Sequence, residues 1–190
     1  EEAEGFKFDF LVDGELVGGI LHVFDLLEFN GECYRDKPVE TRVQTLSIFA
    51  CEYIRYVPLT TGKDKRKLHA KLVKNRGEGV VFKRLGARYS VGRPASGGNY
   101  LKFKFYSTCS CRVSKVNLKR SVSLEMSCGT PVGNVTIPAN HDIPGKGDVV
   151  EIRYLYAYEG GSLYQPTYLG VRDDVDPDTL DSLKLKNEEE

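Results

Sequence analysis

The side chains best suited to chemistry in this chain are carboxylates and lysines on short, strand-like segments. In FLVDGELVGG, at residues 10–19, the alternation of a strand would place Asp13 and Glu15 on one face. Two carboxylates on one side of a strand suit a magnesium ion that also holds phosphate oxygens, because magnesium prefers hard oxygen ligands. An acidic β-turn would explain the letters DGE as well, and taken alone the segment favours the turn.

A second group of charged residues lies in EGVVFKR (78–84) and YLKFKFY (100–106). Glu78 opens the first of these strands, and Lys102 and Lys104 share one face of the second. Two ammonium groups about 7 Å apart repel each other, so an anion such as a phosphate between them would stabilise the pair. The alternative is an ordinary amphipathic strand with solvated lysines.

The elements that must position these residues change in kind along the chain. Residues 8–29 are strand-like, and a helix is expected from the proline of KPVETRVQTLSIFACEYI. A second, basic helix is expected in KDKRKLHAKLVKNRG, where Gly77 closes it. The two quoted strands then follow, joined by the glycine-rich loop at 92–99. This alternation predicts a mixed α+β domain.

After Ser107 the pattern is almost entirely strands separated by turn signals such as CGTPVG and NHDIPGKG. About five short strands in roughly 70 residues suit a small Greek-key barrel of the oligonucleotide-binding (OB) type. The chain ends in an acidic stretch that includes NEEE. The expected fold is therefore α+β, with an all-β barrel after the mixed domain.

Composition excludes several classes of protein. The 27 basic and 27 acidic residues cancel, although basic residues gather between 63 and 120, where they could hold a phosphate backbone. No apolar run approaches the roughly 18 residues of a transmembrane helix, and the first residues do not resemble a signal peptide. The five scattered cysteines form no paired zinc-binding set and indicate a reducing compartment. We expect a soluble intracellular monomer, cytoplasmic or nucleoid-associated, without a membrane partner and not secreted.

Five segments, in this order, resemble the serial motifs III, IIIa, IV, V and VI of ATP-dependent DNA ligases: DGELV (13–17), VFDLLEFNGECYRDKPVETR (23–42), EGVVFKR (78–84), YLKFKF (100–105) and QPTYLGVRDD (165–174). Those enzymes belong to the covalent nucleotidyltransferase superfamily, and the resemblance covers nearly the whole chain. It implies a partial adenylation (nucleotidyltransferase) domain at residues 1–107 and an OB-fold domain at 108–175. The acidic C-terminal tail then occupies 176–190.

The resemblance also implies roles for the residues of the first domain. Glu15 and Glu78 would bind the catalytic Mg2+, and Phe24 would stack on the adenine of ATP or AMP. Lys102 and Lys104 would contact the α-phosphate, which agrees with the repulsion between them noted above.

Three further residues lie in or near these motifs. Lys83 ends motif IV, where a further nucleotide contact is expected. The role of Arg42, which follows the family's Pro-x-x-x-Arg pattern, is left open, and Arg172 of motif VI is expected to contact DNA.

The predicted barrel offers further cations for a duplex backbone, which requires no reading of bases. Lys119 and Arg120 lie in an expected turn, and Lys115 and Arg153 are additional candidates.

Two departures from the family pattern concern catalysis. Motif I, K-x-D-G, supplies the lysine that becomes adenylated, and its nearest counterpart is Lys7-Phe8-Asp9-Phe10, which lacks the glycine and lies too close to DGELV. Motif VI, R-x-D-K, ends here in Val175 instead of lysine. We therefore expect the nucleophilic lysine to be absent from the chain and to be supplied by a missing N-terminal segment.

The expected function is that of an ATP-dependent DNA ligase, acting in DNA repair or replication. Such an enzyme seals nicks in duplex DNA through lysyl-AMP and DNA-adenylate intermediates, and this portion alone is expected to be inactive in self-adenylation. The alternatives are a non-catalytic, ligase-like module that binds DNA, and an RNA ligase or capping-type nucleotidyltransferase.

Overall fold

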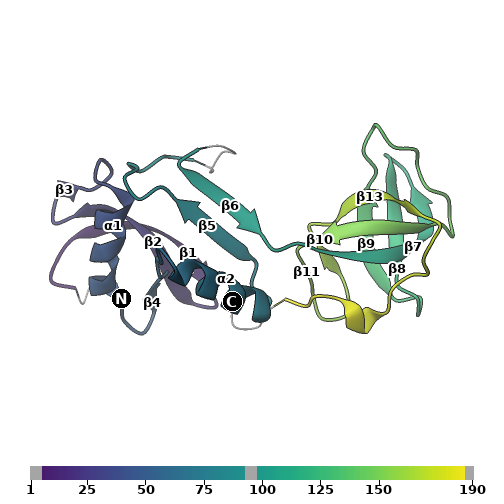
Figure 1. The fold of residues 1–190 in the computed structure, drawn as a ribbon, viewed down its shortest axis with the longest axis horizontal. Coiled ribbons are helices and arrows are strands. Elements are labelled where there is room, and N and C mark those ends of the chain that lie inside the picture. Colours follow the sequence, from purple (N-terminus) through teal and green to yellow (C-terminus); the bar gives the residue numbers. More distant parts are fainter. Residues whose placement is uncertain (1–5, 93–97, 187–190) are drawn as a thin grey trace. The chain divides into compact units, whose positions relative to one another are not determined.

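The computed structural model of this protein describes residues 6–92 and 98–186, and the chain divides into two compact units. Unit 1 comprises residues 1–70 and 80–103, and unit 2 comprises residues 71–79 and 104–189. Unit 1 mixes helices and strands, and unit 2 is built almost entirely from strands (Figure 1). This confirms the predicted α+β fold class. No helix in the described ranges is long and apolar enough to cross a membrane.

Unit 1 is organised around a four-stranded sheet. Strands β1 (Phe10–Val17), β2 (Ile20–Phe29) and β3 (Glu32–Cys33) are antiparallel neighbours, and β4 (Ile54–Tyr56) pairs in parallel with β2. The β1–β2 turn consists of Gly18 and Gly19, with φ of 57° and 85°. Two successive positive φ values suit a tight hairpin turn, which glycine adopts without strain. The residues DGE therefore lie within strand β1. The alternative interpretation, which placed them in an acidic β-turn, is wrong.

The register between β1 and β2 slips twice. Asp13 lies opposite Asp25 and Gly14 lies opposite Val23, so Phe24 is an extra residue on β2 without a partner on β1. Such a β-bulge bends the strand and redirects a side chain. Gly14 is required here, because a Cβ at this position would lie 2.8 Å from the carbonyl oxygen of His22.

Helix α1 (Val39–Thr45) packs on this sheet and continues as a 3-10 helix, η2 (Leu46–Phe49). Pro38 precedes α1 as expected, but the helix predicted to run to Ile54 ends earlier. Ala50 is extended, and Ile54 begins the strand that pairs with β2. Tertiary pairing has therefore overridden the helical spacing. The buried residues of this core are Val23, Leu26, Tyr34, Val39, Val43, Leu46, Phe49, Ile54, Ala87 and Tyr100.

The two segments predicted as strands are β5 (Gly79–Lys83) and β6 (Tyr100–Lys104), which pair with each other in a separate two-stranded sheet. The basic helix α2 (Asp64–Lys74) precedes them and has no buried residue. The helix ends at Lys74, three residues before Gly77, the glycine predicted to close it. Arg76 adopts the left-handed conformation with φ of 57°, and its N–H and that of Gly77 bond back to the last turn of the helix.

Unit 2 contains a five-stranded sheet. Its strand order is β13 (Thr167–Arg172), β10 (Val149–Tyr154), β7 (Ser107–Asn117), β8 (Ser121–Glu125) and β9 (Pro131–Thr136). Strands β11 (Tyr156–Ala157) and β12 (Leu163–Tyr164) form a separate two-stranded hairpin. The unit is OB-like, as expected, and within the described ranges its outer strands β13 and β9 share no ladder, so the sheet does not close into a complete barrel. Closure requires the outer strands to meet in hydrogen-bonding register.

The segment near the C-terminus belongs to the packing of unit 2. Leu183 is only 3% exposed and joins the core of the sheet. The N–H of Ala157 donates to the carbonyl of Lys184, and the N–H of Lys186 donates to the carbonyl of Ala157. Part of the segment predicted as an acidic tail is therefore held on this unit as far as Lys186. Residues 187–190 lie outside the described residues, and the predicted domain boundaries stay predictions.

We expect Leu183→Ala to lower the free energy of unfolding of unit 2 by about 2–5 kcal/mol, because it removes a buried side chain and leaves a cavity. Leu185→Ala is the matched control, since that side chain is 38% exposed and its loss should change stability by about 0.5 kcal/mol or less. Urea unfolding of the two variants measures the difference. Equal midpoints for both would show that the segment does not stabilise the unit.

Candidate functional site

A buried ion pair lies at the centre of unit 1. Asp25 and Arg42 are 1% and 0% exposed, and the arginine donates from Nε and Nη2 to the two carboxylate oxygens at 2.6 and 3.0 Å. Nη1 donates to the carbonyls of Lys37 and Ala87 at 2.5 and 3.1 Å, and Nη2 also donates to the hydroxyl of Tyr100 at 2.6 Å. A charged pair can be kept out of water only when its remaining donors are also bonded, as they are here.

The electrostatics of this pair are dominated by two opposed effects. Burial alone would lower the pKa of Arg42, but hydrogen bonds to Asp25 and the charge of Asp25 outweigh it and raise that pKa above its ordinary value. Burial, with Asp25 close by, raises the pKa of Tyr100. Arg42 therefore stays charged, and Tyr100 stays a neutral hydroxyl that can accept from it.

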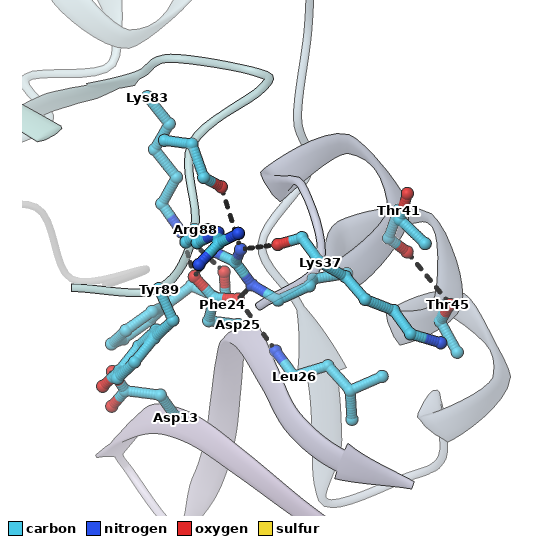
Figure 2. A network of polar contacts seen from close by, with 12 residues as sticks. Asp13, Phe24, Asp25, Leu26, Lys37, Thr41, Thr45, Lys83, Arg88 and Tyr89 are labelled. Carbon is cyan, nitrogen blue, oxygen red and sulfur yellow. Dashed lines mark hydrogen bonds and ion pairs between the residues drawn. The ribbon is translucent and has the colours of Figure 1, made fainter. Parts of the chain in front are cut away.

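The bulge on β2 is fixed by a lysine from β5. The ammonium of Lys83 donates to the carbonyl of Phe24 at 2.7 Å and to Oδ2 of Asp25 at 3.4 Å (Figure 2). The same nitrogen lies 5.5 Å from the ring centroid of Phe24 and 5.3 Å from that of Tyr100. A cation at this distance over an aromatic face is attracted to it. Lys83 thus holds both the backbone and the ring of the extra residue.

A third contact ties the segment after β5 to β1. The hydroxyl of Tyr89 donates to Oδ2 of Asp13 at 2.8 Å (Figure 2), and burial together with this carboxylate raises the pKa of Tyr89 to about 12. Asp13 lies directly opposite Asp25 on the neighbouring strand. Two carboxylates in this position would repel each other, and Arg42, Lys83 and Tyr89 offset that repulsion.

These contacts bring together five parts of unit 1 that are distant in sequence: β1, β2, α1, the residues from Lys83 to Tyr89, and the start of β6. The sequence indicated several of these residues: Asp13 of motif III, the FD pair of motif IIIa, Lys83 of motif IV, and Arg42 of the Pro-x-x-x-Arg pattern. It gave no signal for Tyr89 or Tyr100, because a tyrosine hydroxyl acquires a partner only through the tertiary fold.

The structure places the other predicted residues of motifs III to V as follows. Glu15 is exposed on β1 opposite His22. Lys102 is exposed on β6, and two positions further Lys104 donates to Oε1 of Gln165 at 2.9 Å. Glu78 is half-buried just before β5.

Two predictions bring these residues together: a metal site of Glu15 with Glu78, and a phosphate-binding pair of Lys102 with Lys104. Glu15 and Lys102 belong to unit 1, whereas Glu78 and Lys104 belong to unit 2. The predicted metal site and the predicted phosphate-binding pair therefore stay predictions.

The cationic side chains predicted to contact DNA differ in whether they already bind other groups of this chain. Lys119 and Arg120 adopt left-handed conformations between β7 and β8, as the expected turn requires. The guanidinium of Arg120 donates to three backbone carbonyls, those of Ile137, Pro138 and His141.

Arg172 is engaged by carboxylates instead. It pairs with both oxygens of Asp174, at 2.6 and 2.8 Å, and lies 3.4 Å from Glu151. The hydrogen bonds and charge of Asp174 raise the pKa of Arg172. In contrast, Lys119 is exposed and has no partner in the described part of the chain.

Comparison with known proteins identifies related sequences and folds. Residues 7–104, just over half of the chain, match the family model described as ATP dependent DNA ligase domain. The solved structure Pmar-Lig_PreS3 aligns with a TM-score of 0.67 at 16% identity, over 90% of this chain and 53% of that chain. A structure from work on DNA binding with a minimal scaffold in Lig E DNA ligases aligns with a TM-score of 0.61 at 16% identity, over 80% of this chain and 63% of that chain.

At such identities the structural likeness shows the fold alone. This chain spans less than two thirds of the length of either ligase structure. No curated protein sequence matches it significantly.

Proposed function

Because this chain belongs to the ATP-dependent DNA ligase domain family, we propose that it supplies the nucleotide-contacting and DNA-contacting part of an enzyme that seals nicks in duplex DNA. The observation that carries the proposal is the bulge residue Phe24, whose ring and carbonyl are held by Lys83 beside the buried pair of Asp25 and Arg42. An aromatic ring fixed in this way is a ready platform for a purine base. We assign the enzyme to DNA repair or replication inside the cell.

The proposed reaction is a series of three phosphoryl transfers. A lysine amine attacks the α-phosphorus of ATP, forming a nitrogen–phosphorus bond while pyrophosphate leaves. The AMP then passes to the 5′-phosphate of a nick, and the 3′-hydroxyl finally displaces AMP as it closes the strand. Catalysis of such steps depends on positioning and on neutralising phosphate charge.

This chain's residues would serve those needs in separate ways. Phe24 would stack on adenine, with the cation of Lys83 at its side. Lys102 and Lys104 would neutralise the α-phosphate.

A magnesium ion would be held mainly by phosphate oxygens and water, with Glu15 and Glu78 as its protein ligands. The described residues contain no group of three or more His, Cys, Asp or Glu side chains that could hold a metal by themselves. Any metal therefore depends on the bound nucleotide for part of its ligand set.

The acceptor lysine is the part that the 190 residues do not supply, since no K-x-D-G sequence occurs among them. We therefore expect the chain, incubated with ATP and Mg2+, to show no AMP adduct by intact mass spectrometry. It should still bind AMP non-covalently, as measured by calorimetry, because the proposed base platform lies within the chain.

Two variants test that platform. Phe24→Ala should weaken AMP binding about 5- to 150-fold, which corresponds to the roughly 1–3 kcal/mol that stacking on an aromatic side chain contributes. Phe82→Ala is the control, because that ring is 48% exposed on β5 and has no proposed role. Wild-type affinity of Phe24→Ala would remove Phe24 from the site, and a covalent adduct would show that the chain has its own acceptor.

A second candidate is a non-catalytic ligase-like module that binds DNA. The two proposals differ in what surrounds the chain. A K-x-D-G coding segment immediately upstream in the gene would favour the ligase, and a start codon directly before Glu1 would favour the module.

A further inference from the structure

Unit 2 contains a hollow of about 560 Å3 whose walls are mostly polar. It lies between the residues that follow α2, the start of β7, the end of β10 and the segment near the C-terminus. Its nine lining residues include Arg76, Tyr106, Ser107, Thr108, Asp181 and Lys184. Serine and threonine hydroxyls, arginine and lysine are the groups that proteins use to contact phosphates.

Charge in the hollow is predominantly positive. Arg76 and Lys184 are cationic, and Asp181 is the single acidic residue among the nine described residues that line it. The ammonium of Lys184 is held by the carbonyls of Gly77 and Phe105 at 3.1 and 2.7 Å. It therefore adds a fixed positive charge, whereas Arg76 supplies a guanidinium that can reach a ligand.

Arg76 occupies a backbone position that favours glycine. It is the left-handed residue two positions after the last residue of α2, with φ of 57°, where a side chain is mildly strained and glycine is the usual residue. A strained non-glycine residue is a reason to look for a function of its side chain.

A second arginine lies at the edge of the hollow. Arg153 of β10 is opposite Thr108 of β7, so the two side chains share a face of the sheet. Its guanidinium carbon lies 4.8 Å from the ring centroid of Tyr106, and both residues are exposed. The aromatic face fixes the guanidinium next to the hollow without neutralising it.

The arginines of unit 2 fall into two groups. There are five of them: Arg76, Arg112, Arg120, Arg153 and Arg172. Arg112 and Arg172 are paired with carboxylates, and Arg120 is bonded to backbone carbonyls. In the described residues, neither a carboxylate nor a carbonyl pairs with the guanidinium of Arg76 or Arg153. The two arginines that remain available are therefore the two at the hollow.

We propose that this hollow, with Arg76 inside it and Arg153 at its edge, binds phosphates of the DNA backbone. The inference rests on the proposed function only in taking DNA as the partner. It locates the contact in unit 2 at residues other than the predicted Arg120 and Arg172, whose guanidinium groups are already engaged. Binding of this kind reads no bases and depends on counterion release.

The test measures how the binding of a nicked duplex to the 190-residue chain changes with salt, using fluorescence anisotropy. Arg76→Gly removes a guanidinium while suiting the left-handed backbone, so this variant should fold at least as stably as the wild type. Arg153→Gln removes the other. Arg112→Gln is the matched control, because it changes the net charge equally but replaces an arginine already paired with Glu125.

Each of the two hollow variants should reduce the slope of log binding constant against log salt by about 0.9, the value for one lost phosphate contact on duplex DNA. In the double variant the slope should fall by about twice as much, and Arg112→Gln should keep the wild-type slope. Wild-type slopes for the hollow variants would overturn this inference and leave DNA as the partner. A wild-type chain that fails to bind DNA even at low salt would overturn both this inference and the proposed partner.

Discussion

Arg42→Ala is expected to lower the free energy of unfolding of unit 1 by about 3–5 kcal/mol. Removing one partner of a buried ion pair leaves the other charge uncompensated in a poorly solvated place. Here the residue left behind is Asp25, which is 1% exposed and would retain the N–H of Leu26 and the ammonium of Lys83 as hydrogen-bond donors. Such a loss is a large part of the roughly 5–15 kcal/mol that stabilises a typical domain.

Arg88→Ala is the matched control for this prediction. Arg88 also pairs with an aspartate, Asp36, but at 3.3 Å and with both side chains more than three quarters exposed. Exposed pairs of this kind contribute about 0–1 kcal/mol. The chain contains no tryptophan, so hydrogen exchange measured by mass spectrometry during a urea titration is the better measurement, because it follows peptides of each unit separately. Equal losses of unfolding free energy for the two variants would show that burial does not increase the contribution of the Asp25–Arg42 pair to stability.

A double-mutant cycle measures the coupling free energy between the charges of Asp25 and Arg42. Asp25→Ala alone leaves the guanidinium of Arg42 buried with three neutral partners, and the double variant removes both charges together. The double variant should therefore lose less stability than the sum of the two single variants. Because Asp25 follows Phe24 directly, the same variants should also weaken AMP binding if the buried pair positions the bulge.

The limits of sequence reasoning are visible in this network. The FD pair and the Pro-x-x-x-Arg pattern pointed to the correct segments, because each is a local motif. The role of Arg42 stayed open since its partners lie 17 positions away at Asp25 and 58 positions away at Tyr100. The bulge at Phe24 was missed for a related reason, because a register slip depends on the neighbouring strand and not on the alternation of one strand.

The arginines illustrate a different limit. Positive charge and an expected turn made Arg120 and Arg172 natural candidates for DNA contact. The sequence could not show that the loop after β9 brings carbonyls to Arg120, or that Asp174 binds Arg172 through two hydrogen bonds. Charge is readable from sequence, whereas the availability of that charge depends on what the fold places beside it.

The strand patterns were predicted more reliably than the helix ends. The alternation in YLKFKF correctly predicted β6, and the turn signals after Ser107 correctly predicted an all-β unit. The end of the first helix was wrong, because pairing of Ile54 with β2 competes with helical spacing. Short apolar segments fit either structure, and the tertiary partner decides between them.

The largest effect on catalysis is expected for Lys102→Ala. In a polypeptide that also carries a K-x-D-G segment, this change should reduce the rate of AMP transfer about 100- to 1,000-fold, the usual effect of removing one group that stabilises transition-state charge. Stability should change little, because Lys102 is exposed on β6 and no partner contacts it in the described part of the chain. Single-turnover adenylation with labelled ATP measures the rate directly.

Kinetic parameters separate the proposed role of Lys102 from simple ATP binding. If the ammonium acts on charge that develops at the α-phosphate, kcat should fall more than KM changes, whereas loss of uniform binding would raise KM alone. Lys102→Arg should recover part of the rate, because it restores the charge with different geometry. Lys67→Ala is the control, since the side chain of that lysine is 83% exposed and pairs with Asp64 on the surface of α2. Normal AMP transfer by Lys102→Ala would exclude Lys102 from the site. Lys102 and Lys104 would then be the solvated lysines of an ordinary amphipathic strand.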